Sequence, residues 1–127
     1  MILDLAMLVL ARGLLRAGSP MRAHKVLLRV GARLPPIRTA EQARAALRSI
    51  SRHGTCLSRS MAVAARARRA DVAIGVDPER KAPLFAHAWI EMDGIAVDPN
   101  DVAGAVIARL RGPESALRAE AHPGRSA

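Results

Sequence analysis

The spacing at which apolar residues recur changes near residue 70, and this change constrains the fold more than any other feature of the sequence. Before it, apolar residues recur at i, i+3, i+4 and i+7, the spacing of an amphipathic helix. After it, short apolar or alternating runs follow one another, as strands do. Helices followed by strands predict an α+β domain, in which helices pack on a small antiparallel sheet. The expected helices span residues 2–17, 21–34, 40–52 and 56–69, and the expected strands span residues 72–76, 85–92 and 95–98.

Capping residues mark the starts of several predicted helices. Thr39, three residues before Gln42, forms a capping-box signature ahead of the third helix. Thr55 is expected to cap the fourth helix, and Val26, Leu27 and Val30 are expected to share one face of the second. A last helix is predicted from residue 100 or 101 through residue 110, with Asn or Asp as its cap.

A hairpin with a two-residue turn at Asp93-Gly94 is the strongest local signal in the second half. This turn pairs Trp89 with Asp98, because the two strands run back from it residue by residue. Side chains alternate between the faces of a strand, so His87 and Asp98 share one face as diagonal neighbours, about 7 Å apart at the backbone. The other face is predicted to meet the core, because all of its members are apolar: Ala86, Ala88, Ile90 and Met92.

Size and charge limit the classes of protein that fit. The chain has 127 residues, which suits one domain, predicted over residues 1–111 with a flexible tail over residues 112–127. The formal charge of +9 favours an anionic partner, so a basic helical nucleic-acid-binding protein is one alternative. The arginines are spread along the helices, so an acidic peptide fits equally well. The apolar stretch over residues 1–10 is too short to span a bilayer and is interrupted by Asp4, so it is predicted to be a core helix.

The single cysteine is the strongest candidate for chemistry. Cys56 has no partner for an intramolecular disulfide or a thiolate zinc site, which suits a reducing cytoplasm. In the first turn of a helix its sulfur would lie beside unpaired N–H groups, which favour the thiolate and could receive an oxyanion. His87 would exchange the proton and Asp98 would orient the imidazole. The sequence therefore predicts a Cys-His-Asp triad that needs no metal, nucleotide or other cofactor.

Each member of the triad also has a purely structural interpretation. A lone cysteine in an alanine-rich helix is often a small buried hydrophobe. His87 can be a structural or surface histidine, and Asp98 can begin the turn that follows it or cap the next helix. Trp89 is expected in the core or in a pocket wall. Only the convergence of a helix start and two paired strands points to catalysis.

Four segments together carry a family resemblance. They are Cys-Leu-Ser-Arg-Ser-Met-Ala from Cys56 at a helix start, Ile-Gly-Val at residues 74–76, Ala-His-Ala-Trp-Ile-Glu-Met-Asp-Gly at residues 86–94, and Asp98. This pattern resembles the lasso-peptide leader peptidases, which are bacterial members of the transglutaminase-like superfamily with a papain-like core. The resemblance makes Cys56 the nucleophile, His87 the general base and Asp98 the orienting acid, with Asp101 as the substitute if Asp98 serves as a cap.

The resemblance also implies a biological role. A cytoplasmic cysteine peptidase would remove the leader of a ribosomally made lasso precursor, before a separate ATP-dependent cyclase closes the ring. The helical N-terminal half implies the separate-protease form, whose partners are the precursor, a stand-alone leader-recognition (RRE) protein and the cyclase, without nucleic acid or membrane. Another transglutaminase-like amide hydrolase or transferase stays open, because the same triad serves it. Arg59 and Glu91 are candidates for contacts with an extended precursor, or are structural charges.

Overall fold

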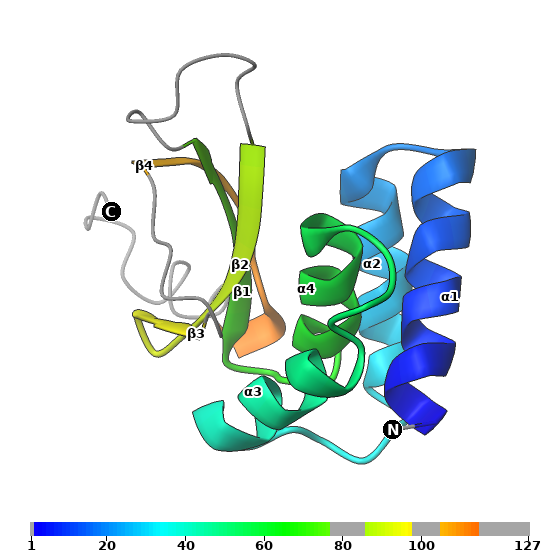
Figure 1. Ribbon diagram of the computed structural model, residues 1–127, viewed down its shortest axis with the longest axis horizontal. Helices are drawn as coiled ribbons and strands as arrows, with labels where there is room; N and C mark the ends of the chain where they lie inside the picture. Colours follow the sequence, from blue (N-terminus) through cyan, green and yellow to red (C-terminus); the bar gives the residue numbers. More distant parts are fainter. Residues whose placement is uncertain (1, 77–85, 98–104, 115–127) are drawn as a thin grey trace.

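The computed structural model describes residues 2–76, 86–97 and 105–114, which form a layer of helices beside a four-stranded sheet (Figure 1). The predicted α+β class is confirmed. The elements are α1 (Ile2–Ala17), α2 (Pro20–Gly31), α3 (Ala40–Ser49), α4 (Cys56–Ala64), β1 (Ala70–Val76), β2 (Ala86–Met92), β3 (Ile95–Val97) and β4 (Ala105–Leu110).

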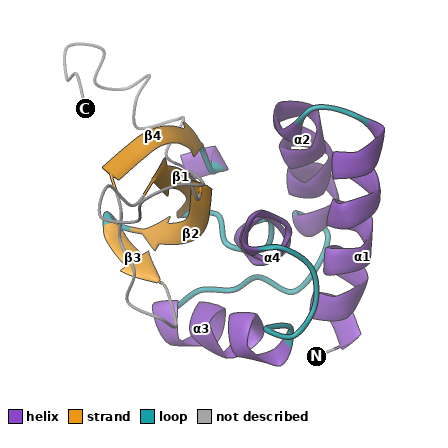
Figure 2. Cartoon of the chain, turned by 45° about the horizontal axis from the view of Figure 1, so that its top comes forward, coloured by secondary structure: helices purple, strands orange, loops and turns teal. Residues whose placement is uncertain are grey.

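Helix α4 is the centre of the packing. Figure 2 shows it surrounded by α1, α2 and α3 and by the sheet. A helix enclosed in this way must be apolar on nearly all sides, and Met61, Val63 and Ala64 are completely buried. Met7, Leu8 and Ala11 of α1 are buried in the same cluster, which confirms the predicted core helix at the N-terminus. Among the described residues, no helix has the length and apolar character needed to cross a membrane.

The sheet has the strand order β3-β2-β1-β4, and all its pairs are antiparallel. The predicted hairpin register is confirmed, with Met92 opposite Ile95 and Ile90 opposite Val97. Asp93 and Gly94 have φ angles of 53° and 80°, the left-handed conformations that a type I′ turn requires. The predicted core face of β2 is confirmed for three of its members, which are Ala88, Ile90 and Met92.

The prediction of a last helix through residue 110 is wrong for residues 105–110, which form strand β4. This strand pairs with β1, with Leu110 opposite Val72 and Arg109 opposite Ala73. A short apolar run does not distinguish strand from helix, and its β-branched Val106 and Ile107 suit a strand. The outer edge of β1 has backbone groups that need partners, and β4 supplies them.

Three helices end earlier than predicted, at Gly31, Ser49 and Ala64. The predicted apolar face of α2 is also partly wrong, because Val26 and Val30 are 37% and 36% exposed. The buried face follows Ala23, Leu27 and Gly31, which are four residues apart and therefore lie on one side of the helix. The valines lie one position away from this stripe.

Gly31 is buried where α2 meets the end of α4, and the contact leaves no room for a side chain. A Cβ atom there would overlap the backbone carbonyl of Ala65. We expect Gly31→Ala to lower the free energy of unfolding by about 2 kcal/mol, because rigid backbone would have to move. Gly13→Ala in α1 is the matched control: it meets no atom within 4 Å and should add about 0.5–1 kcal/mol. Urea denaturation measures both, and equal effects would contradict the close packing.

Three contacts hold the segment after β4 against the rest of the fold. His24 of α2 is buried, and its Nε2 lies 2.8 Å from the carbonyl oxygen of Arg111. The Gly112 N–H donates to Oδ1 of Asp71 at 2.7 Å, and the Glu114 N–H donates to the Arg68 carbonyl at 3.2 Å. Residues 112–114 of the predicted tail therefore contact the start of β1, whereas residues 115–127 lie outside the described part of the chain.

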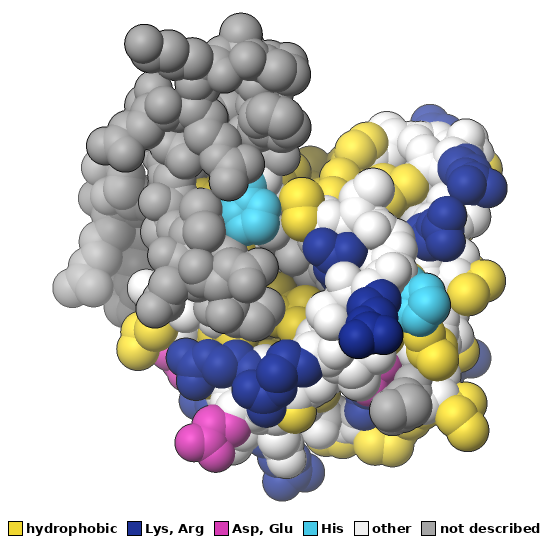
Figure 3. Space-filling view, viewed as in Figure 1, with side chains coloured by type: hydrophobic (Ala, Val, Ile, Leu, Met, Phe, Trp, Pro, Cys, Tyr) yellow, Lys and Arg dark blue, Asp and Glu magenta, His cyan; other side chains and the backbone are white. Residues whose placement is uncertain are grey.

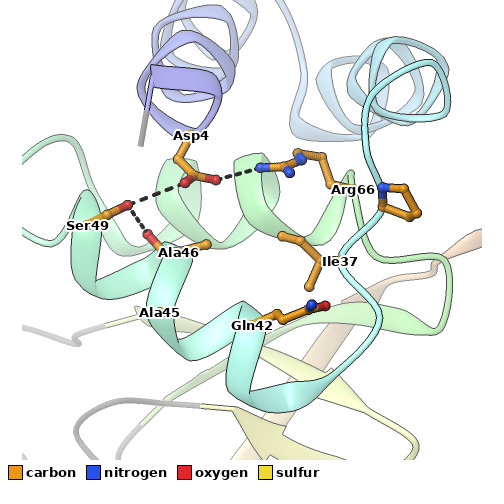
Figure 4. A pocket seen from close by; sticks show the side chains of 8 residues that line it. Asp4, Ile37, Gln42, Ala45, Ala46, Ser49 and Arg66 are labelled. Atoms are coloured by element: carbon orange, nitrogen blue, oxygen red, sulfur yellow. Dashed lines mark hydrogen bonds and ion pairs between the residues drawn. The ribbon is translucent and has the colours of Figure 1, made fainter.

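Asp4 lies inside the helical layer although it is charged. Its Oδ1 forms an ion pair of 2.8 Å with Nη1 of Arg66, and its Oδ2 accepts from the Ser49 hydroxyl at 3.4 Å (Figure 4). Both side chains are largely buried, with 8% of Asp4 and 12% of Arg66 exposed. This ion pair joins the beginning of α1 to the residues that follow α4.

Candidate active site

The site begins at the first residue of α4, where the chain turns into the helix. The Thr55 hydroxyl accepts the Ser58 N–H at 3.2 Å, and the Ser58 hydroxyl accepts the Thr55 N–H at 2.9 Å. This reciprocal pair is a capping box, so the predicted cap at Thr55 is confirmed. It fixes the position of Cys56, the first residue of the helix, relative to the helix axis.

The loop before the helix is held by its own residues. Gly54 has a φ of 68°, and a Cβ atom on it would lie 2.7 Å from the Ser58 hydroxyl, so this position needs glycine. Nη1 of Arg59 donates to the carbonyl oxygens of His53 and Gly54 at 3.0 and 2.8 Å. The Arg59 guanidinium therefore has a structural role in shaping the helix start.

The sulfur of Cys56 contacts the edge of strand β2. Its Sγ accepts the backbone N–H of Ala88 at 3.4 Å. One helical turn later, the Ser60 hydroxyl donates to the Ala88 carbonyl at 3.3 Å. The N–H and C=O of one residue point to the same side of an antiparallel strand. Cys56 and Ser60 therefore occupy one edge of β2 at Ala88. Two residues further along the strand, at Ile90, the described pairing with β3 begins.

This edge position places the sulfur level with the sheet instead of beneath it. Cys56 is half-buried and packs against the edge of the core cluster. The peptide nitrogen that it contacts is the one that joins His87 to Ala88. Strand alternation directs Ala88 toward the helices and His87 toward the opposite face. The hydrogen bond places the sulfur beside the backbone that joins these two residues.

The face of the sheet that carries His87 has its own contacts. The rings of His87 and Trp89 are stacked, with centroids 5.8 Å apart and an interplanar angle of 27°. In the neighbouring strand, Gly75 lies opposite His87 and adds no side chain to this face. Trp89 is 3% exposed, and its Nε1 is buried without a hydrogen-bond partner in the described ranges. The indole therefore restricts the orientations open to the imidazole.

Glu91 continues the same face and is already paired. Its Oε1 accepts from Nε of Arg109 on β4 at 2.9 Å, across the strand that separates them. Glu91 and Arg109 thus join the two strands that flank β1. The two charges that sequence reasoning offered as substrate contacts, Glu91 and Arg59, both have partners within the fold.

Two of the predicted site residues, Cys56 and His87, lie within the described part of the chain. The Cys56 sulfur is one hydrogen bond from Ala88, the residue after His87, and the His87 ring is stacked on Trp89. Asp98 and its substitute Asp101 lie outside the described residues, although the confirmed hairpin register ends at Val97, directly before Asp98.

Sequence reasoning missed two serines that position the cysteine. Ser58 completes the capping box, and Ser60 binds the strand at the same residue as the sulfur. Their spacing from Thr55 and from Cys56 was a usable signal. Ser58 stands three residues after Thr55, as a capping box requires, and Ser60 stands four residues after Cys56, on the same side of the helix.

Together, the fold and the site define a class of protein. A cysteine opens the central helix, that helix packs against an antiparallel sheet, and a histidine lies on the facing strand of this α+β domain. The chain belongs to the transglutaminase-like superfamily, whose family model matches residues 1–110. Comparisons with curated proteins and with solved structures find no match. The superfamily is compatible with cysteine peptidases and with amide hydrolases or transferases.

Proposed function

We propose that this protein is a cysteine peptidase that removes the leader from a lasso-peptide precursor, with Cys56 as nucleophile, His87 as general base and Asp98 as the acid that orients the ring. The observation that carries the proposal is the position of Cys56, a half-buried residue at a helix start whose sulfur lies 3.4 Å from the backbone nitrogen of Ala88, the residue after His87. Membership of the transglutaminase-like superfamily supports the chemistry. The segments from Cys56 and around His87 support the lasso assignment by their resemblance to leader peptidases.

The reaction would follow the usual course of thiol catalysis. The Cys56 thiolate attacks the last carbonyl of the leader, and His87 delivers the proton to the departing amine. Water then hydrolyses the thioester and releases the leader with a free carboxylate. The Ser58 N–H is already bonded to the cap, so the N–H groups of Cys56 and Leu57 are the donors proposed for the oxyanion.

The electrostatic environment of the sulfur supports this role. The start of α4 carries the positive end of the helix dipole, and the Ala88 N–H adds a second donor from the sheet. Both place partial positive charge beside the sulfur. The stacked indole of Trp89 would hold the imidazole while Asp98, the residue after Val97, accepts its second N–H.

The test is to incubate the protein with a synthetic lasso precursor and a separately purified leader-recognition protein in water enriched in ¹⁸O. We expect mass spectrometry to detect an intact leader fragment with one ¹⁸O atom in its new carboxylate, and a core peptide with a free amine. Omitting the recognition protein should slow the reaction by about tenfold or more, because leader binding supplies the orientation. Release of ammonia or transfer to an added amine, without leader cleavage, would instead indicate an amide hydrolase or transferase.

A further inference from the structure

A groove lies at the end of α4 opposite the cysteine. It consists of two adjoining hollows of about 420 and 350 Å³, both lined by Pro36 and Arg68. The apolar lining of the larger hollow comes from the end of α2 and from the chain segments around it, and it includes Leu28, Ala32, Leu34, Pro36, Ala65 and Pro113. We call this combined surface the basic groove, because arginines form its margins.

Not all of these arginines are available to a ligand. Arg66 is bonded to Asp4 and to the Pro35 carbonyl, and Arg69 is bonded to the Arg38 carbonyl and to Asp93. They are parts of the fold.

Arg29 and Arg68 are different. Arg29 is exposed and has no ion pair among the residues that the structure describes. The Arg68 side chain is 66% exposed, and Glu114 approaches it only to 3.9 Å. An exposed pair this loose is weak, so an incoming carboxylate can displace Glu114.

The position of the groove separates it from the catalytic centre. Helix α4 has nine residues and is therefore about 14 Å long. An extended peptide advances about 3.3 Å per residue, so at least about four residues must separate a segment in the groove from a carbonyl at Cys56. The formal charge of +9 favours an acidic ligand, and Figure 3 shows basic side chains spread over the visible face of the helical half with few acidic ones between them.

We infer that the basic groove is an exosite for a segment of the leader that combines acidic and apolar side chains and lies at least about four residues before the scissile bond. Its leucine- or valine-like side chains contact the apolar lining, and its carboxylates pair with Arg29 and Arg68. This inference rests on the proposed function for the identity of the ligand, but the binding itself needs no catalysis. If the segment binds equally in the ground state and the transition state, its binding energy lowers KM and leaves kcat unchanged.

The binding test uses the full chain with Cys56→Ala, so that nothing is cleaved. The probes are two fluorescein-labelled ten-residue peptides, one alternating Glu and Leu and one alternating Gln and Leu, followed by fluorescence anisotropy. We expect the acidic peptide to bind at least tenfold more tightly than the Gln peptide. Arg29→Glu with Arg68→Glu should abolish this preference.

Arg16→Glu with Arg22→Glu is the matched control. This double variant changes the net charge by the same amount as the test pair. Like the test pair, it replaces one arginine in the last turn of a helix by glutamate, but neither Arg16 nor Arg22 lines the groove. It should leave the dissociation constant within twofold. Equal losses in both double variants would overturn the inference, because they would mean that only net charge matters. The inference would also be overturned if duplex DNA displaced the labelled acidic peptide at a lower concentration than the unlabelled acidic peptide does.

Cleavage separates the exosite from the proposed function. With a full precursor, the variant that carries Arg29→Glu and Arg68→Glu should have a KM at least fivefold higher than that of the parent protein. Its kcat should stay within twofold of the parent value. When the leader of the precursor is shortened to three residues, the parent protein and this variant should cleave it at equal rates. An unchanged KM on the full precursor would overturn the exosite while leaving the peptidase intact. If the parent protein cleaves no precursor, the proposed function fails, and the binding comparison alone then decides whether the groove takes an acidic peptide.

Discussion

Replacing Cys56 with alanine is expected to lower the rate of leader cleavage by at least about 10⁴-fold while leaving the fold intact. The sulfur is the proposed attacking atom, and no other cysteine exists in the chain to replace it. The fold should survive because the capping box of Thr55 and Ser58 does not involve the Cys56 side chain. Mass spectrometry of the leader fragment measures the rate, and circular dichroism checks the fold.

Ser60→Ala is the matched control for this change. Ser60 contacts the same residue of β2 as the sulfur, and it is 3% exposed. Its loss removes one anchor between helix and strand but keeps the nucleophile, so we expect a loss of less than about 100-fold. Cys56 is the single cysteine, so iodoacetamide should form one adduct with the parent protein. Loss of activity in proportion to the labelled fraction would support Cys56 as the nucleophile. Cys56→Ala protein that keeps more than a few per cent of the parent rate would show that another group is the nucleophile.

Replacing Asp4 with alanine is expected to lower the free energy of unfolding by about 3 kcal/mol, the largest effect on stability that we foresee. The Arg66 guanidinium would remain in a position where only 12% of its side chain is exposed, with its Nη1 no longer paired to a carboxylate. Its Nε and Nη2 bonds to the Pro35 carbonyl, at 3.1 and 3.0 Å, would still hold it there. A loss of this size should lower Tm by about 10 °C in a domain of this length.

Two further variants test whether the loss of stability in Asp4→Ala comes from leaving the Arg66 charge buried and unpaired. Asp4→Leu with Arg66→Met should recover most of the lost stability, because apolar residues of similar volume often replace a buried pair without cost. Glu91→Gln removes one partner of a more exposed pair, with 36% of the Arg109 side chain exposed, and should cost less than about 1 kcal/mol. A cost below 1 kcal/mol for Asp4→Ala in urea denaturation would mean that the guanidinium moves out to water.

Features set by neighbours in the sequence could be predicted from the sequence. The capping box of Thr39 and Gln42 is present as predicted, because each hydrogen bond joins residues three positions apart. The Asp93-Gly94 turn determines the hairpin register in the same way, since both of its residues adopt the positive φ angles that such a turn needs. The position of Cys56 at the start of a helix also follows from the adjacent Thr55.

Features that depend on distant residues could not be predicted in this way. Residues 105–110 form a strand because the edge of β1, some thirty residues earlier, offers unpaired backbone groups. Val26 and Val30 are exposed because the buried side of α2 includes Gly31, whose lack of a side chain permits a close contact with Ala65 that the helical spacing does not reveal. Arg66 likewise finds Asp4 only after the chain has folded.

The sequence by itself therefore determined the capped starts of α3 and α4 and the hairpin with its register, because these depend on hydrogen bonds within a few positions. Only the tertiary structure decided that Cys56 and Ser60 hold one edge of β2 at Ala88, thirty-two and twenty-eight residues away. That contact forms when the apolar sides of α4 and the sheet are buried against each other. Burial is non-directional, so the residues that meet depend on how the whole core packs.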